Sequence, residues 1–192
     1  NVRIVGEDAC RVDYDRLMNG SPWRCISNLP YAASTPLLCH FLAHRNPPRE
    51  MFLLLQQEVA ARLAAQPGEK AYGAVTVRLR LRYDVKIIRR IPPEVFYPPP
   101  EVNSVQVRMQ WRKASEQEPE DALRHASALA RLGFSQRRKQ LRKLLLSEYD
   151  KHAVDRALTA CDIEPDARAE DLDLRQFLTL GEHLNGFLRN HR

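Results

Sequence analysis

The chain has 192 residues, of which 44% are hydrophobic, enough for one core and a small second one. No apolar run approaches the roughly 18 residues that cross a bilayer, and no signal peptide is visible, so we expect a soluble, non-membrane protein. The four cysteines (Cys10, Cys25, Cys39 and Cys161) lack metal-ligand spacing, which favours reduced thiols in the cytoplasm and no bound metal. Thirty Lys and Arg against 24 Asp and Glu give a net charge of +6, and we expect the clustering of the cations to matter more than this excess.

Residues 2–5, with the sequence Val-Arg-Ile-Val, are predicted to form a short strand. Asp8 and Ala9 follow shortly after it. An acidic side chain just beyond a strand end can accept hydrogen bonds from the adenine or ribose of a cofactor. A solvated loop carboxylate is the alternative interpretation of Asp8.

The apolar run at residues 23–26 is predicted to be a buried strand end, and Ser34-Thr35-Pro36 predicts a helix over residues 36–44. A hydroxyl N-cap followed by proline at the first helical position is a typical helix start. The loop between this strand and this helix therefore lies beyond the carboxyl end of a strand, where open α/β sheets bind ligands.

This loop contains the tetrapeptide Asn28-Leu29-Pro30-Tyr31. The Asn28 amide offers a donor and an acceptor, and Pro30 turns Leu29 away from helical geometry, which frees the Leu29 carbonyl. Tyr31 adds a flat ring. Such a set suits an exocyclic amino group on a flat heterocycle, although a simple turn has the same composition.

Residues 51–56 form a continuous apolar run that is typical of a central strand covered on both faces, and residues 57–65 continue as a helix. Residues 72–91 contain a long β-branched, alternating stretch. If it is extended, Arg78, Arg80 and Arg82 share one side and either face RNA or are solvated.

The proline-rich residues 91–103 predict a stiff, extended loop, and a strand follows in which Val105, Val107 and Met109 alternate. A stiff loop would hold Phe96 at a fixed height beside the site with little entropy lost on binding. The alternative is that Phe96 is a core anchor beneath the loop.

Polar residues 112–120 predict a boundary between a first domain, residues 1–113, and a helical second domain, residues 119–192. Helices are predicted over residues 121–132, 135–149 and 151–161. The last helix begins at Asp173, and Gln176 three residues on completes a capping box.

A basic cluster lies in the helix that Ser135 is predicted to cap. Arg137, Arg138 and Lys139 fall in its first turn, where the helix dipole disfavours cations, and such a local conflict often marks a function. Helix amides and cations together would bind RNA phosphate, although a solvated charged face is the alternative. The RNA-binding residues predicted on this surface are Arg137, Arg138, Lys139, Arg142 and Lys143.

Six segments, in order along the chain, resemble one family. They are Asn28-Leu-Pro-Tyr, Gln56-Gln-Glu-Val-Ala-Ala-Arg-Leu, Ala71-Tyr-Gly, Phe96-Tyr-Pro-Pro-Pro-Glu-Val-Asn-Ser, Phe134-Ser-Gln-Arg-Arg-Lys-Gln-Leu-Arg and Arg168-Ala-Glu-Asp-Leu. They are similar to segments of the small-subunit ribosomal RNA adenine dimethyltransferases, the KsgA family. That family transfers methyl groups from S-adenosylmethionine to N6 of two adjacent adenosines near the 3′ end of small-subunit rRNA.

The resemblance implies an α/β fold, namely the C-terminal part of a Rossmann-like methyltransferase domain followed by a small all-helical RNA-binding domain. It implies S-adenosylmethionine as cofactor, small-subunit rRNA or the immature small subunit as partner, a role in ribosome biogenesis, and a monomer. The catalytic residues that it implies are Asn28, Leu29, Pro30, Tyr31 and Phe96, and the cofactor-binding residues are Asp8, Ala9 and Asn28.

The chain departs from the family pattern in three places. Glu101 and Asn103 stand where the family often has Lys and Asp. The Gly-rich first motif and the acidic second strand-end motif are not found. With residues 2–8 as the third strand, an N-terminal helix and two βα units, roughly 80–90 residues, are expected before Asn1, so we expect the chain as given to be incomplete for activity.

Two other functions remain open. One is a non-catalytic RNA-binding or ribosome-assembly module. The other is a large-subunit rRNA adenine methyltransferase of the antibiotic-resistance type. The basic cluster and the Arg168-Ala-Glu-Asp-Leu segment favour the small-subunit group.

Overall fold

A computed structural model describes residues 2–113 and 118–187, without the side chain of Tyr31. Its residues form two compact units, Asn1–Ala61 with Tyr83–Trp111, and Arg62–Arg82 with Arg112–Arg192. Within the described ranges, no helix combines the length and the apolar character needed to cross a membrane.

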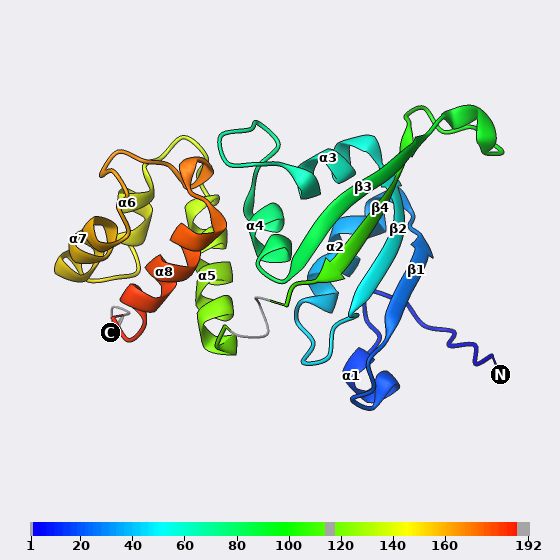
Figure 1. The fold of residues 1–192 in the computed structure, drawn as a ribbon, viewed down its shortest axis with the longest axis horizontal. Helices are drawn as coiled ribbons and strands as arrows, with labels where there is room; N and C mark the ends of the chain where they lie inside the picture. Colours follow the sequence, from blue (N-terminus) through cyan, green and yellow to red (C-terminus); the bar gives the residue numbers. More distant parts are fainter. Residues whose placement is uncertain (1, 114–117, 188–192) are drawn as a thin grey trace. The chain divides into compact units, whose positions relative to one another are not determined.

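The helices and strands follow in this order (Figure 1). The first unit contains α1 (Tyr14–Met18), β1 (Arg24–Asn28), η1 (Tyr31–Ala33), α2 (Ser34–Phe41), β2 (Glu50–Gln56), β3 (Tyr83–Ile91), η2 (Pro93–Val95) and β4 (Ser104–Trp111). The helix α3 (Gln57–Ala64) spans the boundary between the units in the sequence. The second unit contains α4 (Ala74–Arg80), α5 (Glu120–Gly133), α6 (Leu141–Leu145), α7 (Lys151–Ala160), η4 (Ala169–Asp171) and α8 (Leu174–Leu184).

The sheet of the first unit has the strand order β1-β2-β4-β3. β1 pairs parallel with β2, whereas β4 runs antiparallel to both β2 and β3. The carboxyl ends of β1, β2 and β3 and the start of β4 therefore meet at one edge. There Asn28 is in register with Leu54, and Ser104 with both Gln56 and Ile91. The loop between β3 and β4 projects beyond this edge (Figure 1).

The predicted strand at residues 51–56 is confirmed as a central strand, but it is not equally covered on its two faces. Met51, Leu53 and Leu55 are buried, whereas Phe52 and Leu54 on the opposite face are only half-buried. The predicted burial of the strand end at residues 23–26 is wrong, because Ile26 is 82% exposed. Ile26 belongs to an edge strand and lies in register with Phe52 on the less covered face.

The predicted strand at residues 2–5 is also wrong. These residues take no regular secondary structure and join none of the described strand pairs. A strand is defined by its ladder of hydrogen bonds to a neighbour, and an apolar pattern alone does not supply that neighbour. Val2 and Ile4 are accordingly 86% and 90% exposed.

Residues 72–91 are not one extended stretch, because α4 precedes β3. In a helix Val77 and Leu81, four residues apart, share a face, and both belong to the core of the second unit. The row of Arg78, Arg80 and Arg82 therefore does not exist. Instead, Arg80 donates a hydrogen bond to the Ala65 carbonyl at 2.6 Å, and Arg82 forms an ion pair with Glu120.

Residues 62–82 pack with the C-terminal helices, although the sequence assigned them to the first domain. The Tyr72 hydroxyl donates a buried hydrogen bond of 3.0 Å to the Leu172 carbonyl, and Tyr72, Val77 and Leu81 join the same apolar cluster as residues of α5, α7 and α8. The predicted second domain, residues 119–192, lies inside this unit. Residues 114–117 of the predicted boundary lie outside the described residues.

The predicted helices at residues 121–132 and 151–161 are confirmed as α5 and α7. The start of α8 is confirmed too, because Asp173 accepts a hydrogen bond from the Gln176 amide at 2.8 Å and the Gln176 side chain accepts one from the Asp173 amide at 3.1 Å. Gly133 at the end of α5 allows a close approach, since a Cβ there would lie 2.8 Å from the Cβ of Ala169.

The predicted helix over residues 135–149 is wrong. Residues 134–140 form turns, and the helix that follows, α6, has only five residues. The Ser135 hydroxyl donates to the Leu132 carbonyl at 2.6 Å, so it bonds to the end of α5 and does not cap a new helix. The Leu141 amide bonds to the Ala167 carbonyl at 2.8 Å, which ties the start of α6 to a loop distant in sequence.

We predict that Tyr72→Phe lowers the free energy of unfolding by about 1–3 kcal/mol at pH 8, because the Leu172 carbonyl loses its buried donor. Burial raises the pKa of Tyr72 from 10.0 to about 12. The folded protein thus holds this proton more tightly than the unfolded chain, so the stability that Tyr72 contributes is present below pH 10 and is lost as the pH rises toward 12. The difference between wild type and variant should shrink over that interval.

Urea unfolding followed by circular dichroism measures both effects. The matched control is Tyr97→Phe, since Tyr97 is fully exposed. Equal stabilities of the two variants at pH 8 would show that the hydrogen bond to Leu172 contributes nothing.

Candidate active site

The Asn28 tetrapeptide turns the chain sharply from β1 into α2. The Leu29 amide donates to the Leu54 carbonyl at 3.4 Å, which continues the β1–β2 ladder for one residue. The Pro30 carbonyl then accepts bonds from the Ala33 amide at 2.9 Å and the Ser34 hydroxyl at 3.3 Å. The helix predicted for residues 36–44 accordingly begins at Ser34 and ends at Phe41, and Ser34 is its first residue and not its N-cap.

A cavity of about 360 Å³ opens at the edge of the sheet where these strands end. Four predicted catalytic residues line it: Asn28, Leu29, Pro30 and Phe96. The side chain of Tyr31, the fifth, lies outside the described part of the structure. The other lining residues are Leu54, Tyr97, Pro98, Pro100 and Ser104. The strand ends and the proline-rich loop, far apart in sequence, thus form one site.

Two oxygen acceptors at this cavity have no hydrogen-bond partner among the described residues. The exposed side-chain amide of Asn28 forms no hydrogen bond with any described residue, and neither does the backbone carbonyl of Leu29. The neighbouring Pro30 carbonyl, by contrast, is fully used in the turn. An amino group that enters the cavity can therefore find two neutral acceptors on consecutive residues.

Aromatic side chains at the same cavity come from the loop between β3 and β4. The Phe96 amide donates to the Pro93 carbonyl at 3.0 Å, which closes the short helix η2 and fixes Phe96. Phe96 is half-buried, whereas the adjacent Tyr97 is 100% exposed. Tyr97 and Leu54 are cavity residues that sequence reasoning missed. The available signals were the position of Tyr97 beside Phe96 and the position of Leu54 near the end of the predicted strand at residues 51–56.

The residues predicted to bind a cofactor are not brought together by the described residues. Asn28 lines the cavity, but Asp8 and Ala9 do not. The Asp8 carboxylate accepts from the Cys10 amide at 2.9 Å, and the Ala9 carbonyl accepts from the Tyr14 hydroxyl at 3.1 Å. Asp8 and Ala9 thus organise the turn before α1. Contact of Asp8 and Ala9 with the cofactor stays a prediction.

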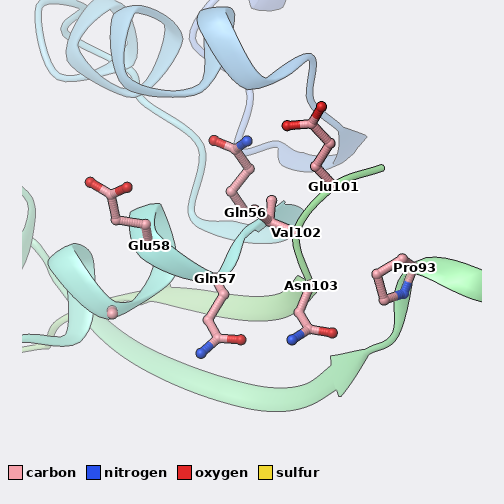
Figure 2. A pocket seen from close by; sticks show the side chains of 8 residues that line it. Gln56, Gln57, Glu58, Pro93, Glu101, Val102 and Asn103 are labelled. Carbon is pink, nitrogen blue, oxygen red and sulfur yellow. The ribbon is translucent and has the colours of Figure 1, made fainter. Parts of the chain in front are cut away.

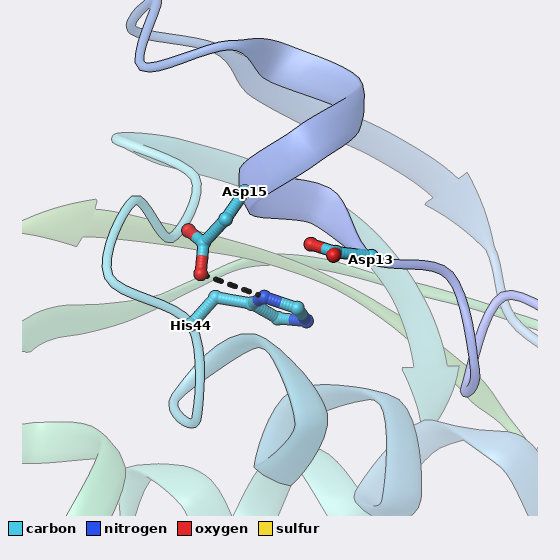
Figure 3. Close-up of side chains that lie close together, drawn as sticks. All are labelled: Asp13, Asp15 and His44. Atoms are coloured by element: carbon cyan, nitrogen blue, oxygen red, sulfur yellow. Dashed lines mark hydrogen bonds and ion pairs between the residues drawn. The ribbon is translucent and has the colours of Figure 1, made fainter.

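Three side chains near α1 could hold a cation by their spacing, Asp13, Asp15 and His44 (Figure 3). Their oxygens already have structural partners. Asp13 caps α1, and Asp15 accepts from His44 at 3.2 Å and from the amides of Arg45 and Asn46 at 3.1 and 2.8 Å. Desolvation opposes ionisation of Asp15, but the two amide hydrogen bonds lower its pKa overall. The cluster holds α1 against the loop after α2.

The basic residues predicted to bind RNA fall into two groups. The Arg137 guanidinium bonds to the carbonyls of Lys70 and Tyr72 and lies 3.6 Å from Glu170. Arg142 binds Asp155 through two hydrogen bonds of 2.7 and 3.1 Å, and this contact lowers the pKa of Asp155. These two arginines are held by the protein itself.

Arg138, Lys139 and Lys143 form the second group, the unpaired basic residues. All three are exposed, and none makes a side-chain hydrogen bond or ion pair with another described residue. Residues 137–139 lie in turns, so the predicted conflict with a helix dipole is wrong. What distinguishes this surface is uncompensated positive charge.

Comparisons with known proteins identify the family of this chain. Residues 1–185 match the family model described as ribosomal RNA adenine dimethylase. Two curated relatives are named ribosomal RNA small subunit methyltransferase A. The protein from Xanthomonas euvesicatoria pv. vesicatoria is 40% identical over 177 residues, and that from Xanthomonas axonopodis pv. citri is 39% identical over 179 residues. These matches cover 92% and 93% of this chain, and 66% of the length of each relative.

Solved structures show the same fold. A dimethyladenosine transferase from Plasmodium falciparum superposes with a TM-score of 0.73 at 25% identity, over 86% of this chain and 68% of that chain. The 23S rRNA methyltransferase ErmE superposes with a TM-score of 0.66 at 20% identity, over 94% of this chain and 71% of that chain, which shows the fold alone. The predicted α/β fold class is confirmed, and the chain belongs to the ribosomal RNA adenine dimethylase family.

Proposed function

We propose that this protein dimethylates adenosines of small-subunit rRNA at N6, with S-adenosylmethionine as methyl donor and a role in ribosome biogenesis. The observation that carries the proposal is the cavity at the strand ends, where two unpartnered acceptors, Asn28 and Leu29, lie beside the ring of Phe96. Family membership and the names of the relatives support the choice of substrate. We further propose that the protein acts as a cytoplasmic monomer on the immature small subunit.

The acceptors address the main difficulty of this reaction, because the lone pair of the adenine amino nitrogen is delocalised into the ring. The Asn28 side-chain oxygen and the Leu29 carbonyl accept its two hydrogens and turn the amino group so that the lone pair points out of the ring plane. Their contribution is orientation and electrostatic stabilisation of the positive charge that develops on N6. S-adenosylmethionine supplies an electrophilic methyl group when bound.

An adenine must leave its stack to reach these acceptors. Phe96 can stack on the extruded base, a contact worth roughly 1–3 kcal/mol. Pro98 and Pro100, which line the same cavity, stiffen the loop so that little order is lost on binding. Tyr31 stays a predicted second stacking residue.

RNA binding is proposed for the second unit at the unpaired basic residues, Arg138, Lys139 and Lys143. Exposed cations without a carboxylate partner release phosphate counterions from RNA when they bind it. Arg137 and Arg142 play a different part in this proposal, since their contacts with Glu170 and Asp155 hold the surrounding turns in place.

A large-subunit rRNA substrate is the second candidate function, which the sequence left open, and a 23S rRNA methyltransferase shares the fold of this chain. The small-subunit assignment is preferred because the relatives that carry that name are 39–40% identical to it.

We predict that Asn28→Ala lowers the rate of methyl transfer by about 10²-fold or more, the usual effect of removing one preorganised polar partner. Asn28→Asp keeps a side-chain oxygen and should retain more activity than the alanine variant. The measurement is single-turnover transfer of labelled methyl to rRNA by the intact protein. RNA affinity should be unchanged, because Asn28 acts on the aligned amino group and not on the RNA backbone.

Full activity of Asn28→Ala would contradict the acceptor mechanism. Asn46→Ala is not a suitable control, since its side chain bonds to the Ser21 carbonyl. Asn185→Ala, at the end of α8 in the other unit, is the matched control and should transfer methyl at the wild-type rate.

We also predict that the double variant Arg138→Glu, Lys139→Glu binds RNA more weakly. The slope of the logarithm of affinity against the logarithm of salt should flatten by about 0.7–0.9 for each lost phosphate contact. Thermal stability should be unchanged, because neither side chain has a protein partner within the described residues.

Fluorescence anisotropy over a salt series provides the measurement, and Arg175→Glu, an exposed cation on α8, is the control. A salt slope that the double variant shares with wild type would mean that these cations do not contact phosphate.

A further inference from the structure

A second cavity, of about 460 Å³, lies next to the candidate active site (Figure 2). Its walls continue the same two segments that form the first cavity. On β2, Leu54 lines the first cavity and Gln56 lines the second, and alternate residues of a strand lie about 7 Å apart. In the proline-rich loop, Phe96 lines the first cavity and Asn103 the second. A molecule that extends from the first cavity along β2 and the proline-rich loop would therefore enter the second cavity.

The backbone holds Gln57 and Asn103 next to each other at the second cavity. The backbone amide of Gln57 donates a hydrogen bond of 3.0 Å to the backbone carbonyl of Asn103. This bond joins the start of α3 to the end of the proline-rich loop. In Figure 2 the Gln57 and Asn103 side chains project from the same side of this junction, whereas Gln56 and Glu101 project on its other side. Each carboxamide carries a donor and an acceptor, the pair that reads the edge of a nucleobase.

The charge of this cavity differs from that of a phosphate site. Glu58 and Glu101 line it, and no Lys or Arg is among its described lining residues. Carboxylates repel phosphate and accept hydrogen bonds from amino groups. Pro93 and Val102 add apolar surface against which a flat ring can lie. The cavity therefore suits the base of a nucleotide and not its phosphate.

We propose that this second cavity is a subsite for the nucleobase next to the target adenosine, and that it favours a base with an exocyclic amino group over uracil. The proposal rests on the proposed function. Adenine, cytosine and guanine each have an amino group that can donate to Glu101, whereas uracil has a carbonyl oxygen at the position of the cytosine amino group. The carboxamide of Gln56, which projects on the same side of the junction as Glu101, orients the base.

The test uses the intact protein and undermethylated immature small subunits whose RNAs differ only in the nucleotides flanking the two adjacent target adenosines, with cytidine or uridine placed in turn on the 5′ and the 3′ side of the pair. We expect kcat/KM for methyl transfer to fall about tenfold with uridine on one of the two sides, within the usual discrimination of a base contact. Glu101→Gln, which keeps the shape of the side chain and removes its charge, should shrink this ratio to about threefold or less. Glu94→Gln, an exposed glutamate of the same loop outside the cavity, should preserve it.

Equilibrium binding of the same subunits, followed by anisotropy, should show the same preference without any catalytic step. Equal rates and affinities for cytidine and uridine RNAs would overturn the subsite and leave the proposed function standing. A preference that survives Glu101→Gln unchanged would also overturn it, since the cavity would not be its source. Absence of methyl transfer to adenosine in every RNA would overturn the proposed function, and the subsite with it.

Discussion

The register between β1 and β2 is the constraint on which the candidate site depends. Asn28 is paired with Leu54, and the Leu29 amide bonds to the Leu54 carbonyl. Because side chains alternate along a strand, a slip of one residue would turn Asn28 to the opposite face and away from the cavity. The antiparallel pairing of β4 with β2 and β3 then brings the proline-rich loop to the same edge. Stacking surface and acceptors thus meet because three strand ends and one strand start are fixed together.

The second unit contains arginines that are bound by other protein groups and basic residues that have no partner among the described residues. Arg137 and Arg142 are engaged by carbonyls and carboxylates of the protein, so their charge holds turns in place. Arg138 and Lys139, next to Arg137 in the sequence, have no such partner within the described residues. Basic residues that are adjacent in the sequence therefore need not share one role. Adjacent residues in turns point in different directions, and the positions of the surrounding acceptors decide which cations are already bound within the protein.

The sequence predicted correctly the elements that depend on residues close together in the chain. It predicted wrongly the elements that depend on a hydrogen-bond partner elsewhere in the chain. The capping box at Asp173, the amphipathic helices α5 and α7, and the loop that carries Asn28 follow from residues adjacent in sequence. The strand expected at residues 2–5 required a pairing neighbour, and Ser135 bonds backward to Leu132 where a new helix start was expected. At residues 72–91 alternation was mistaken for a strand, although Val77 and Leu81 already had helical spacing. Of the candidate site, Asn28, Leu29, Pro30 and Phe96 were predicted. Tyr97, Leu54 and the second cavity depend on register and exposure, which a single sequence does not give.

The most direct test of the account is to identify the methylated nucleoside. The intact protein would be incubated with isotope-labelled S-adenosylmethionine and with undermethylated small-subunit or large-subunit rRNA, and the digested RNA would be analysed by mass spectrometry. The account predicts labelled N6,N6-dimethyladenosine from small-subunit rRNA and little or none from large-subunit rRNA. Label confined to large-subunit rRNA, label on another atom or nucleoside, or no label in either RNA would contradict it.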